Sequence, residues 1–190
     1  SDVYKRQLLL TTSFLIAVAA WGLNIVSGFA GQISLAHGVF VGIGTYTASV
    51  LGGVATTYVI GYELDMIIWL PLSGLSAALI GLLIAPISVR LKGLNLGLVT
   101  LALVFIGSHL FSNLKFITGG AGLGRKAAKL VLFGFDFDEG LVIGSLILEK
   151  NQLTYMLALF VCVLAGLGVK NLTRSKTCLL YTSPSPRDED

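Results

Sequence analysis

The sequence predicts an all-α fold: a polytopic transmembrane helical bundle with about five membrane helices. Hydrophobic residues make up 55% of the 190 residues and charged residues only 12%, whereas soluble domains carry roughly 25% charged residues. The mean hydropathy is +0.87. Residues 8–62 contain no Asp, Glu, Lys or Arg. Since about 20 apolar residues cross a bilayer, this stretch is expected to hold two helices joined by a polar centre.

Five apolar segments are long enough to cross a bilayer. They cover residues 8–26, 35–60, 66–89, 93–114 and 151–169. Pro71 lies in the first turn of the third segment, where proline is tolerated, and Pro86 is expected to kink or end that helix. Residues 141–148 are apolar but too short to span, so we expect a surface or re-entrant piece there.

Both ends of the chain are expected to be non-native. Residues 2–7 and 178–183 can be encoded by the two strands of one short DNA sequence, which resembles a transposon-end adapter from library preparation. The expected organisation is therefore a non-native tail over residues 1–7, a transmembrane domain over residues 8–177 and a second non-native tail over residues 178–190. That domain would be an internal fragment of a longer protein.

Charged residues between the spans predict an orientation. The short loop at residues 90–92 and the segment 170–176 carry Lys and Arg but no acidic residue. Because successive loops lie on opposite sides of the membrane, these two segments share one side. Residues 63–65 and the mixed segment 112–150 share the other side. Each side holds five Lys and Arg, but short basic loops favour the cytoplasm. We therefore expect residues 90–92 and 170–176 to be cytoplasmic.

The centre of the uncharged stretch carries glycines and polar residues. Gly28, Gly31, Gln32 and Ser34 lie there, and His37 follows them. Broken helices with exposed backbone coordinate substrates in many transporters, so this junction is either part of a substrate pathway or a plain turn at the membrane surface. His37 is either a proton carrier or a residue that caps the loop. Capping is favoured because no acidic residue lies nearby in the sequence.

Glycines at the start of the second span predict close helix packing. Gly38, Gly42 and Gly44 have the small-residue spacing that lets membrane helices approach each other. Ordinary tight packing is the favoured interpretation, and the alternative adds that such a pair of helices slides or rocks during transport.

Three polar residues lie inside the apolar spans, namely Asn24, Asn95 and Thr100. Side chains of this kind form hydrogen bonds between membrane helices. Interhelical bonding is therefore the favoured role, and lining a path for a solute is the alternative.

No residue pattern indicates an enzyme or a bound cofactor. Thr118, Gly119 and Gly120 begin a glycine-rich turn after the fourth span, on the expected outer side, but the Gly-Lys-Ser/Thr ending of a P-loop is missing. The sequence has no His-Glu-x-x-His motif and no cysteine pair with metal-ligand spacing. It also lacks the basic stripe with interleaved aromatic residues that is typical of nucleic-acid binding.

Three blocks of sequence resemble a known family. They are residues 23–37 with residues 40–46, residues 90–101, and residues 114–120. In content, order and spacing they are similar to branched-chain amino-acid ABC transporter permeases, and to the M-type permease subunit in particular. The resemblance covers nearly all of residues 8–177, which would then form a permease domain.

The resemblance implies a membrane permease subunit of an ATP-driven importer of branched-chain amino acids. The subunit would form part of the translocation pathway by alternating access, in the plasma (inner) membrane of a bacterium or archaeon. Its implied partners are a second permease subunit, two cytoplasmic ATPase subunits, an extracytoplasmic amino-acid-binding protein and membrane lipid. A preceding helix, the coupling helix and later helices would lie outside this chain.

Three other interpretations stay open on the residues alone. The first is a permease for another small solute, such as an amide or urea, on the same scaffold. The second is an intramembrane enzyme that uses His37, and the third is a purely structural membrane subunit.

Overall fold

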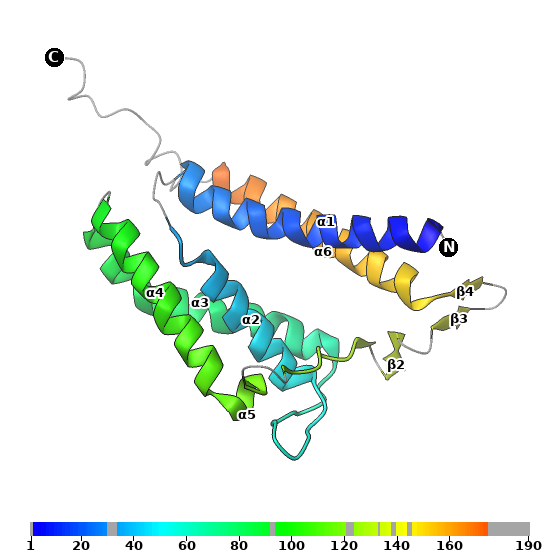
Figure 1. Cartoon of the computed structure of the whole chain (residues 1–190). Helices are drawn as coiled ribbons and strands as arrows, with labels where there is room; N and C mark the ends of the chain where they lie inside the picture. Colours follow the sequence, from blue (N-terminus) through cyan, green and yellow to red (C-terminus); the bar gives the residue numbers. More distant parts are fainter. Residues whose placement is uncertain are drawn as a thin grey trace. The chain divides into compact units, whose positions relative to one another are not determined.

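The computed structural model describes residues 2–29, 34–91, 94–120, 124–132, 134–137, 140–143 and 146–174. The chain divides into two compact units, one formed by residues 1–33 with 151–190 and the other by residues 34–150 (Figure 1). Gly31, Gln32, Lys92 and the expected tail 178–190 lie outside the described residues.

The first unit is a pair of long helices, α1 (Asp2–Asn24) and α6 (Lys150–Thr173) (Figure 1). The ring of Phe14 lies 5.7 Å from the ring of Tyr155. Gly166 lies so close to Trp21 that an added Cβ would come within 3.2 Å of the indole ring. The π-helix η1 (Ile25–Phe29) continues α1. Small residues and aromatic rings therefore hold this pair together, as in other membrane helix contacts.

The second unit is built around α2 (His37–Gly52), which packs mainly on α3 (Met66–Arg90) and also on α4 (Leu94–Asn113). Ser76 donates a hydrogen bond of 3.0 Å to the hydroxyl oxygen of Thr47, which joins α3 to α2. A short helix, α5 (Lys115–Thr118), follows α4. Helix α2 therefore has two helical partners in this unit, α3 and α4.

Two small hairpins follow α5. Strands β1 (Val131–Leu132) and β2 (Phe135–Asp136) pair antiparallel, with Val131 opposite Asp136. Strands β3 (Leu141–Ile143) and β4 (Leu146–Leu148) also pair antiparallel, with Leu141 opposite Leu148. The apolar segment that is too short to span therefore forms a hairpin.

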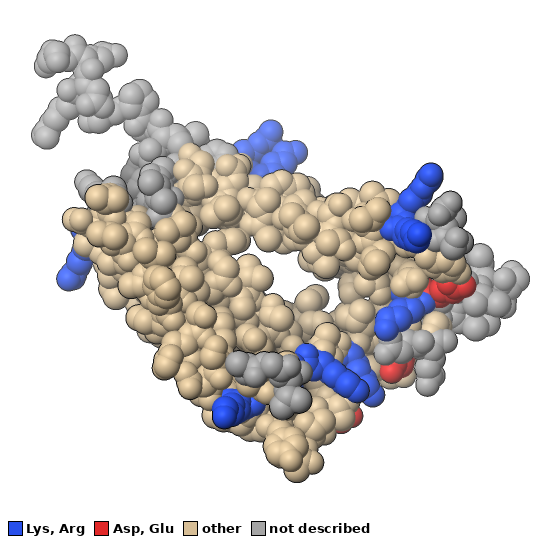
Figure 2. All heavy atoms as spheres, in the orientation of Figure 1, with Lys and Arg blue, Asp and Glu red and all other residues tan. Residues whose placement is uncertain are grey.

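Four helices of the described residues are long and apolar enough to cross a membrane. They are Tyr4–Gly28, Met66–Ser88, Leu94–Asn113 and Lys150–Thr173. Figure 2 shows the charged side chains near the helix ends, with long uncharged stretches between them. These findings confirm a polytopic helical membrane fold. Large apolar side chains such as Leu82 and Leu83 are well exposed in this chain, which suits a surface that faces lipid or further helices.

The prediction of a second span over residues 35–60 is wrong at its far end. Helix α2 has only 16 residues, and so extends about 24 Å against a hydrocarbon core of about 30 Å. Gly53 has an extended backbone, with φ −92° and ψ 159°, and residues 53–65 form a loop. Of the two effects expected for Pro86, an end of the helix is not seen, because α3 continues beyond it to Arg90.

Backbone N–H groups from outside α2 bind the last carbonyls of the helix, where α2 ends early. The backbone N–H groups of Tyr62 and Leu64 donate to the carbonyls of Val50 and Leu51, at 3.1 and 2.8 Å. The N–H of Lys129 donates to the carbonyl of Gly52 at 3.1 Å. Carbonyls at the end of a helix have no partner within the helix. A returning loop that satisfies them therefore stabilises a short helix.

Candidate functional site

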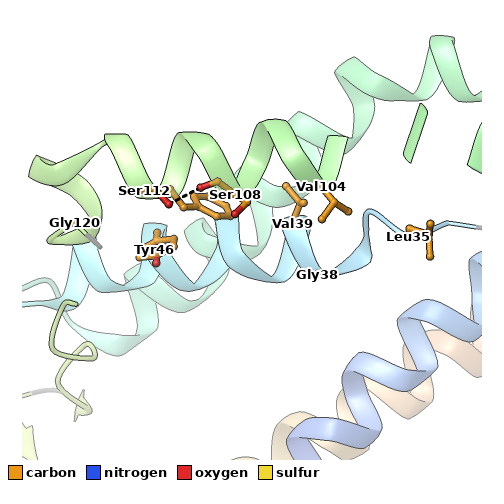
Figure 3. A pocket seen from close by; sticks show the side chains of 9 residues that line it. Leu35, Gly38, Val39, Tyr46, Val104, Ser108, Ser112 and Gly120 are labelled. Atoms are coloured by element: carbon orange, nitrogen blue, oxygen red, sulfur yellow. Dashed lines mark hydrogen bonds between the residues drawn. The ribbon is translucent and has the colours of Figure 1, made fainter. Parts of the chain in front are cut away.

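A groove of about 340 Å³ lies between α2 and α4 (Figure 3). Most of its lining is apolar, and three hydroxyl groups interrupt it. The lining residues are Leu35, Gly38, Val39, Tyr46, Val104, Ser108, Phe111, Ser112 and Gly120. Small-molecule sites of about 300–1,000 Å³ are typically apolar with a few placed polar groups. This groove matches that description at the small end of the range.

An aromatic pair forms part of the groove wall. The rings of Tyr46 on α2 and Phe111 on α4 lie 4.9 Å apart with an interplanar angle of 43°. Phe111 rests on Gly42, where an added Cβ would come within 2.7 Å of the ring. The missing side chain of Gly42 thus makes room for the ring, as close packing of membrane helices requires.

The other glycines of the predicted seam have different surroundings. Gly44 lies on the side of α2 that faces α3, where an added Cβ would lie 3.7 Å from the carbonyl oxygen of Ser73. Gly38 has no atom within 4 Å of an added Cβ among the described residues, and it lines the groove instead. Of these three glycines, only Gly42 therefore lies in a close approach between helices, which the spacing alone does not reveal.

Hydroxyl groups lie along the α4 side of the groove. Ser108 and Ser112 are one helical turn apart, and the hydroxyl of Ser112 donates a hydrogen bond of 2.9 Å to the carbonyl of Ser108 (Figure 3). The phenol of Tyr46 is the third hydroxyl of the lining. Hydroxyls both donate and accept, so this wall can bind either a carboxylate or an ammonium group of a small solute.

The junction before α2 is tied to α4 by Thr100. The backbone N–H of Leu35 donates to the hydroxyl oxygen of Thr100 at 3.3 Å, and that hydroxyl donates to the carbonyl of Gly97 at 3.0 Å. Thr100 is buried. Thr100 thus links α4 to the segment that precedes α2. Thr100 does not line the groove but holds Leu35, which does.

The remaining residues predicted for the junction are spread over both units. Asn24 and Gly28 lie in the first unit, where the missing side chain of Gly28 leaves room for the amide oxygen of Asn24. Ser34 and His37 are half-buried in the second unit, and His37 is the first residue of α2. Asn95 is exposed in the first turn of α4. None of these residues lines the groove.

The predicted outer turn closes one end of the groove. Gly119 and Gly120 have φ of 83° and 79°, a left-handed region that suits glycine. The hydroxyl of Thr118, which is buried, donates to the carbonyl of Leu114 at 3.1 Å and accepts from the N–H of Gly120 at 3.2 Å. Thr118 therefore shapes the turn, and Gly120 lines the groove.

Arg125 joins α5 to the loop that ends α2. Its guanidinium donates to the carbonyl of Ile117 at 3.0 Å and also to the carbonyl of Ile60. The N–H of Ile60 donates to the carbonyl of Phe116 at 3.2 Å. Partial burial lowers the pKa of Arg125, but an arginine remains protonated in proteins. We call Arg125 with its two carbonyl partners the Arg125 latch.

Sequence reasoning missed most of the groove lining and Arg125. The missed residues are Leu35, Val39, Tyr46, Val104, Ser108, Phe111, Ser112 and Arg125. The two serines one turn apart on an apolar helix were a usable signal, because hydroxyls at that spacing share a helix face. The rings gave no signal, since apolar spans contain many aromatic residues that only pack.

Comparison with known proteins decides the family. The model of the family described as "Branched-chain amino acid transport system / permease component" matches residues 7–177. The chain belongs to this family. It is a multi-pass protein of the plasma (inner) membrane in a family of transport permeases, which is not a class of enzymes. The resemblance seen in the sequence is thus confirmed.

Two relatives share the same printed name, high-affinity branched-chain amino acid transport system permease protein LivM. One is from Escherichia coli (strain K12) and the other from Salmonella typhimurium (strain LT2). Each is 34% identical over 129 residues, which cover 68% of this chain and 29% of the relative. The chain therefore spans less than a third of the length of these relatives. No solved structure matches the chain.

Proposed function

We propose that this chain is part of a permease subunit that imports branched-chain amino acids, and that the groove between α2 and α4 forms part of the translocation path. The observation that carries the proposal is the groove itself. It combines apolar walls with three hydroxyls on the two helices α2 and α4. An aliphatic amino acid has the matching chemistry, because its side chain is apolar and its carboxylate and ammonium groups form hydrogen bonds.

The roles within the groove follow from this chemistry. Val39, Val104 and Phe111 provide apolar surface for the side chain of the amino acid. Ser108 and Ser112 provide hydrogen bonds for its charged end. Each such bond replaces one to water, so it contributes only about 1 kcal/mol. Modest affinity suits a transporter, because the solute has to leave the path again.

The driving force comes from partners in this proposal. Two cytoplasmic ATPase subunits hydrolyse ATP, a second permease subunit forms the other half of the path, and an extracytoplasmic binding protein delivers the amino acid. Alternating access then requires two arrangements of the same helices. The Arg125 latch and the Thr118–Gly120 turn lie together at one end of the second unit. We place that end outside and Arg90 inside, in agreement with the positive-inside rule.

Uptake by the full-length parent permease tests the proposal. The complete complex is reconstituted in proteoliposomes with ATP on the ATPase side and the binding protein on the other. ATP-dependent accumulation of leucine, isoleucine and valine is expected. Accumulation of urea or acetamide instead of these amino acids would contradict the proposed substrate class.

A pair of variants tests the groove separately. Ser108→Ala combined with Ser112→Ala is expected to lower leucine uptake about 30-fold, because two hydrogen bonds of about 1 kcal/mol each are lost. Ser88→Ala is the matched control: Ser88 also lies on a membrane helix of this unit and donates to a backbone carbonyl, but it does not line the groove. Equal uptake by both variants would remove the groove from the path.

A further inference from the structure

We propose that the Tyr46–Phe111 ring pair is a size filter for the side chain of the transported amino acid. This inference rests on the proposed function of the groove. The two rings come from different helices and both line the groove. Their separation of 4.9 Å makes them one continuous wall, so the position of the wall sets how large a side chain fits beside it.

The wall is fixed by an interlock of α2 and α4. The ring of Phe111 on α4 lies on Gly42 of α2, and the side chain of Val39 on α2 lies on Gly107 of α4. An added Cβ would come within 2.7 Å of the neighbouring side chain at either glycine. Each helix thus supplies one side chain and one glycine to the contact.

The interlock also sets the width of the groove. Val39 and Phe111 both line it, and Val39 and Gly107 are buried. Packed interiors do not deform continuously, so a side chain added at such a contact has to displace its neighbour. The ring of Phe111 therefore cannot move toward Gly42 to admit a larger solute. A wall of this kind can distinguish solutes by size.

Shape selection in an apolar site has a known scale. In a hydrophobic pocket, two substrates that differ by one methylene are distinguished by roughly 10- to 200-fold. With a volume of about 340 Å³, the groove is small for a ligand site. We expect it to admit valine, isoleucine and leucine and to reject phenylalanine, because the aromatic side chain would need the space that Phe111 occupies.

Thiol protection measures binding in the groove without the binding protein, whose own preference would otherwise obscure the result. The full-length parent complex carries Ser112→Cys, with Cys162→Ala and all other cysteines replaced. A maleimide labels the groove thiol, and leucine or phenylalanine is added at increasing concentration. Leucine is expected to protect the thiol at a concentration at least tenfold below that of phenylalanine.

Four further variants separate the filter from the rest of the groove. Phe111→Leu and, independently, Tyr46→Leu open the wall and are expected to bring the protection by phenylalanine within about threefold of that by leucine. Gly42→Ala adds a Cβ that displaces the Phe111 ring. It is expected to weaken the protection by leucine more than the protection by the smaller amino acid alanine. Gly44→Ala is the control, because its Cβ meets Ser73 at an ordinary 3.7 Å on the other side of α2. It is expected to leave the ratio of leucine to phenylalanine unchanged.

The outcomes are distinct. If leucine protects the thiol but Phe111→Leu and Tyr46→Leu leave its advantage over phenylalanine unchanged, the size filter is overturned and the proposed path stands. If no aliphatic amino acid protects the thiol while the complex still accumulates leucine, the groove is not the path and the filter falls with it. If either Phe111→Leu or Tyr46→Leu loses the preference for leucine over phenylalanine while Gly44→Ala keeps it, the size filter is supported. This holds even if the other ring variant does not assemble.

Discussion

The backbone N–H of Leu35 donates a hydrogen bond of 3.3 Å to the hydroxyl oxygen of Thr100. This single bond ties the segment that enters α2 to the first third of α4, and Leu35 lines the groove between these two helices. The hydroxyl of Thr100 donates in turn to its own helix at Gly97. The position of Leu35 in the groove therefore depends on a buried threonine that does not itself touch the groove.

The first prediction concerns this bond. Thr100→Val keeps the shape of the side chain but removes the acceptor, and the part-buried N–H of Leu35 then loses a hydrogen bond of about 1 kcal/mol. We expect a lower thermal stability of the complex in detergent and reduced leucine uptake. Thr100→Ser keeps the hydroxyl and is expected to retain both. Wild-type stability and uptake in Thr100→Val would show that the Leu35 N–H finds another partner.

The second prediction concerns the Arg125 latch. Arg125→Lys keeps the charge but supplies a single point donor in place of the planar fork that reaches two carbonyls. We expect an added protease to cleave the loop at residues 53–65 faster in Arg125→Lys than in the wild type. The measurement uses right-side-out vesicles, in which the extracytoplasmic side of the protein faces the protease. Because arginine stays protonated, the ratio of the cleavage rates of Arg125→Lys and the wild type, measured with the same protease, should not change between about pH 5 and pH 9.

A neighbouring lysine provides the control for the latch. Lys126 is exposed, so Lys126→Ala removes a positive charge from the same segment without touching Ile60 or Ile117. Its cleavage rate is expected to match that of the wild type. If Arg125→Lys is cleaved no faster than Lys126→Ala, the loop is held by its backbone bonds alone.

The third prediction concerns orientation. Residues 53–65 share one end of the second unit with α5, since Ile60 donates to the carbonyl of Phe116, whereas Arg90 ends α3. Short basic loops favour the cytoplasm. In intact cells, an impermeant thiol reagent should label Glu63→Cys in the full-length parent, and label Arg90→Cys only after permeabilisation. The reverse pattern would invert the topology of the whole unit.

The sequence predicted the long spans well because their signal is local. An uninterrupted apolar stretch identifies a membrane helix by length alone, and 66–89 and 93–114 agree closely with α3 and α4. The early end of α2 could not be predicted in this way. It depends on N–H groups of Tyr62, Leu64 and Lys129, which reach the helix end only once the chain has folded back.

The candidate site shows the same division between local and long-range information. The glycine spacing on α2 predicted close packing, but the helix that Gly42 meets depends on Phe111, far along the chain. Gly38 has the same residue type and spacing yet opens into the groove. Arg125 appeared as an ordinary loop charge, because its carbonyl partners cannot be recognised from residue types.

The last prediction uses this difference between two glycines of one helix. Gly42→Leu places a bulky side chain where even a Cβ would come within 2.7 Å of Phe111. Such overpacking costs about 1–3 kcal/mol or more, so we expect a strongly reduced yield of folded complex in detergent. Gly38→Leu adds the same side chain one helical turn earlier, where no described atom lies within 4 Å of an added Cβ. We expect it to assemble normally and to block leucine uptake, because the new side chain extends into the groove. Reduced yield in both variants would mean that α2 packs against protein along its whole seam, whereas full uptake by Gly38→Leu would show that the groove is not part of the path.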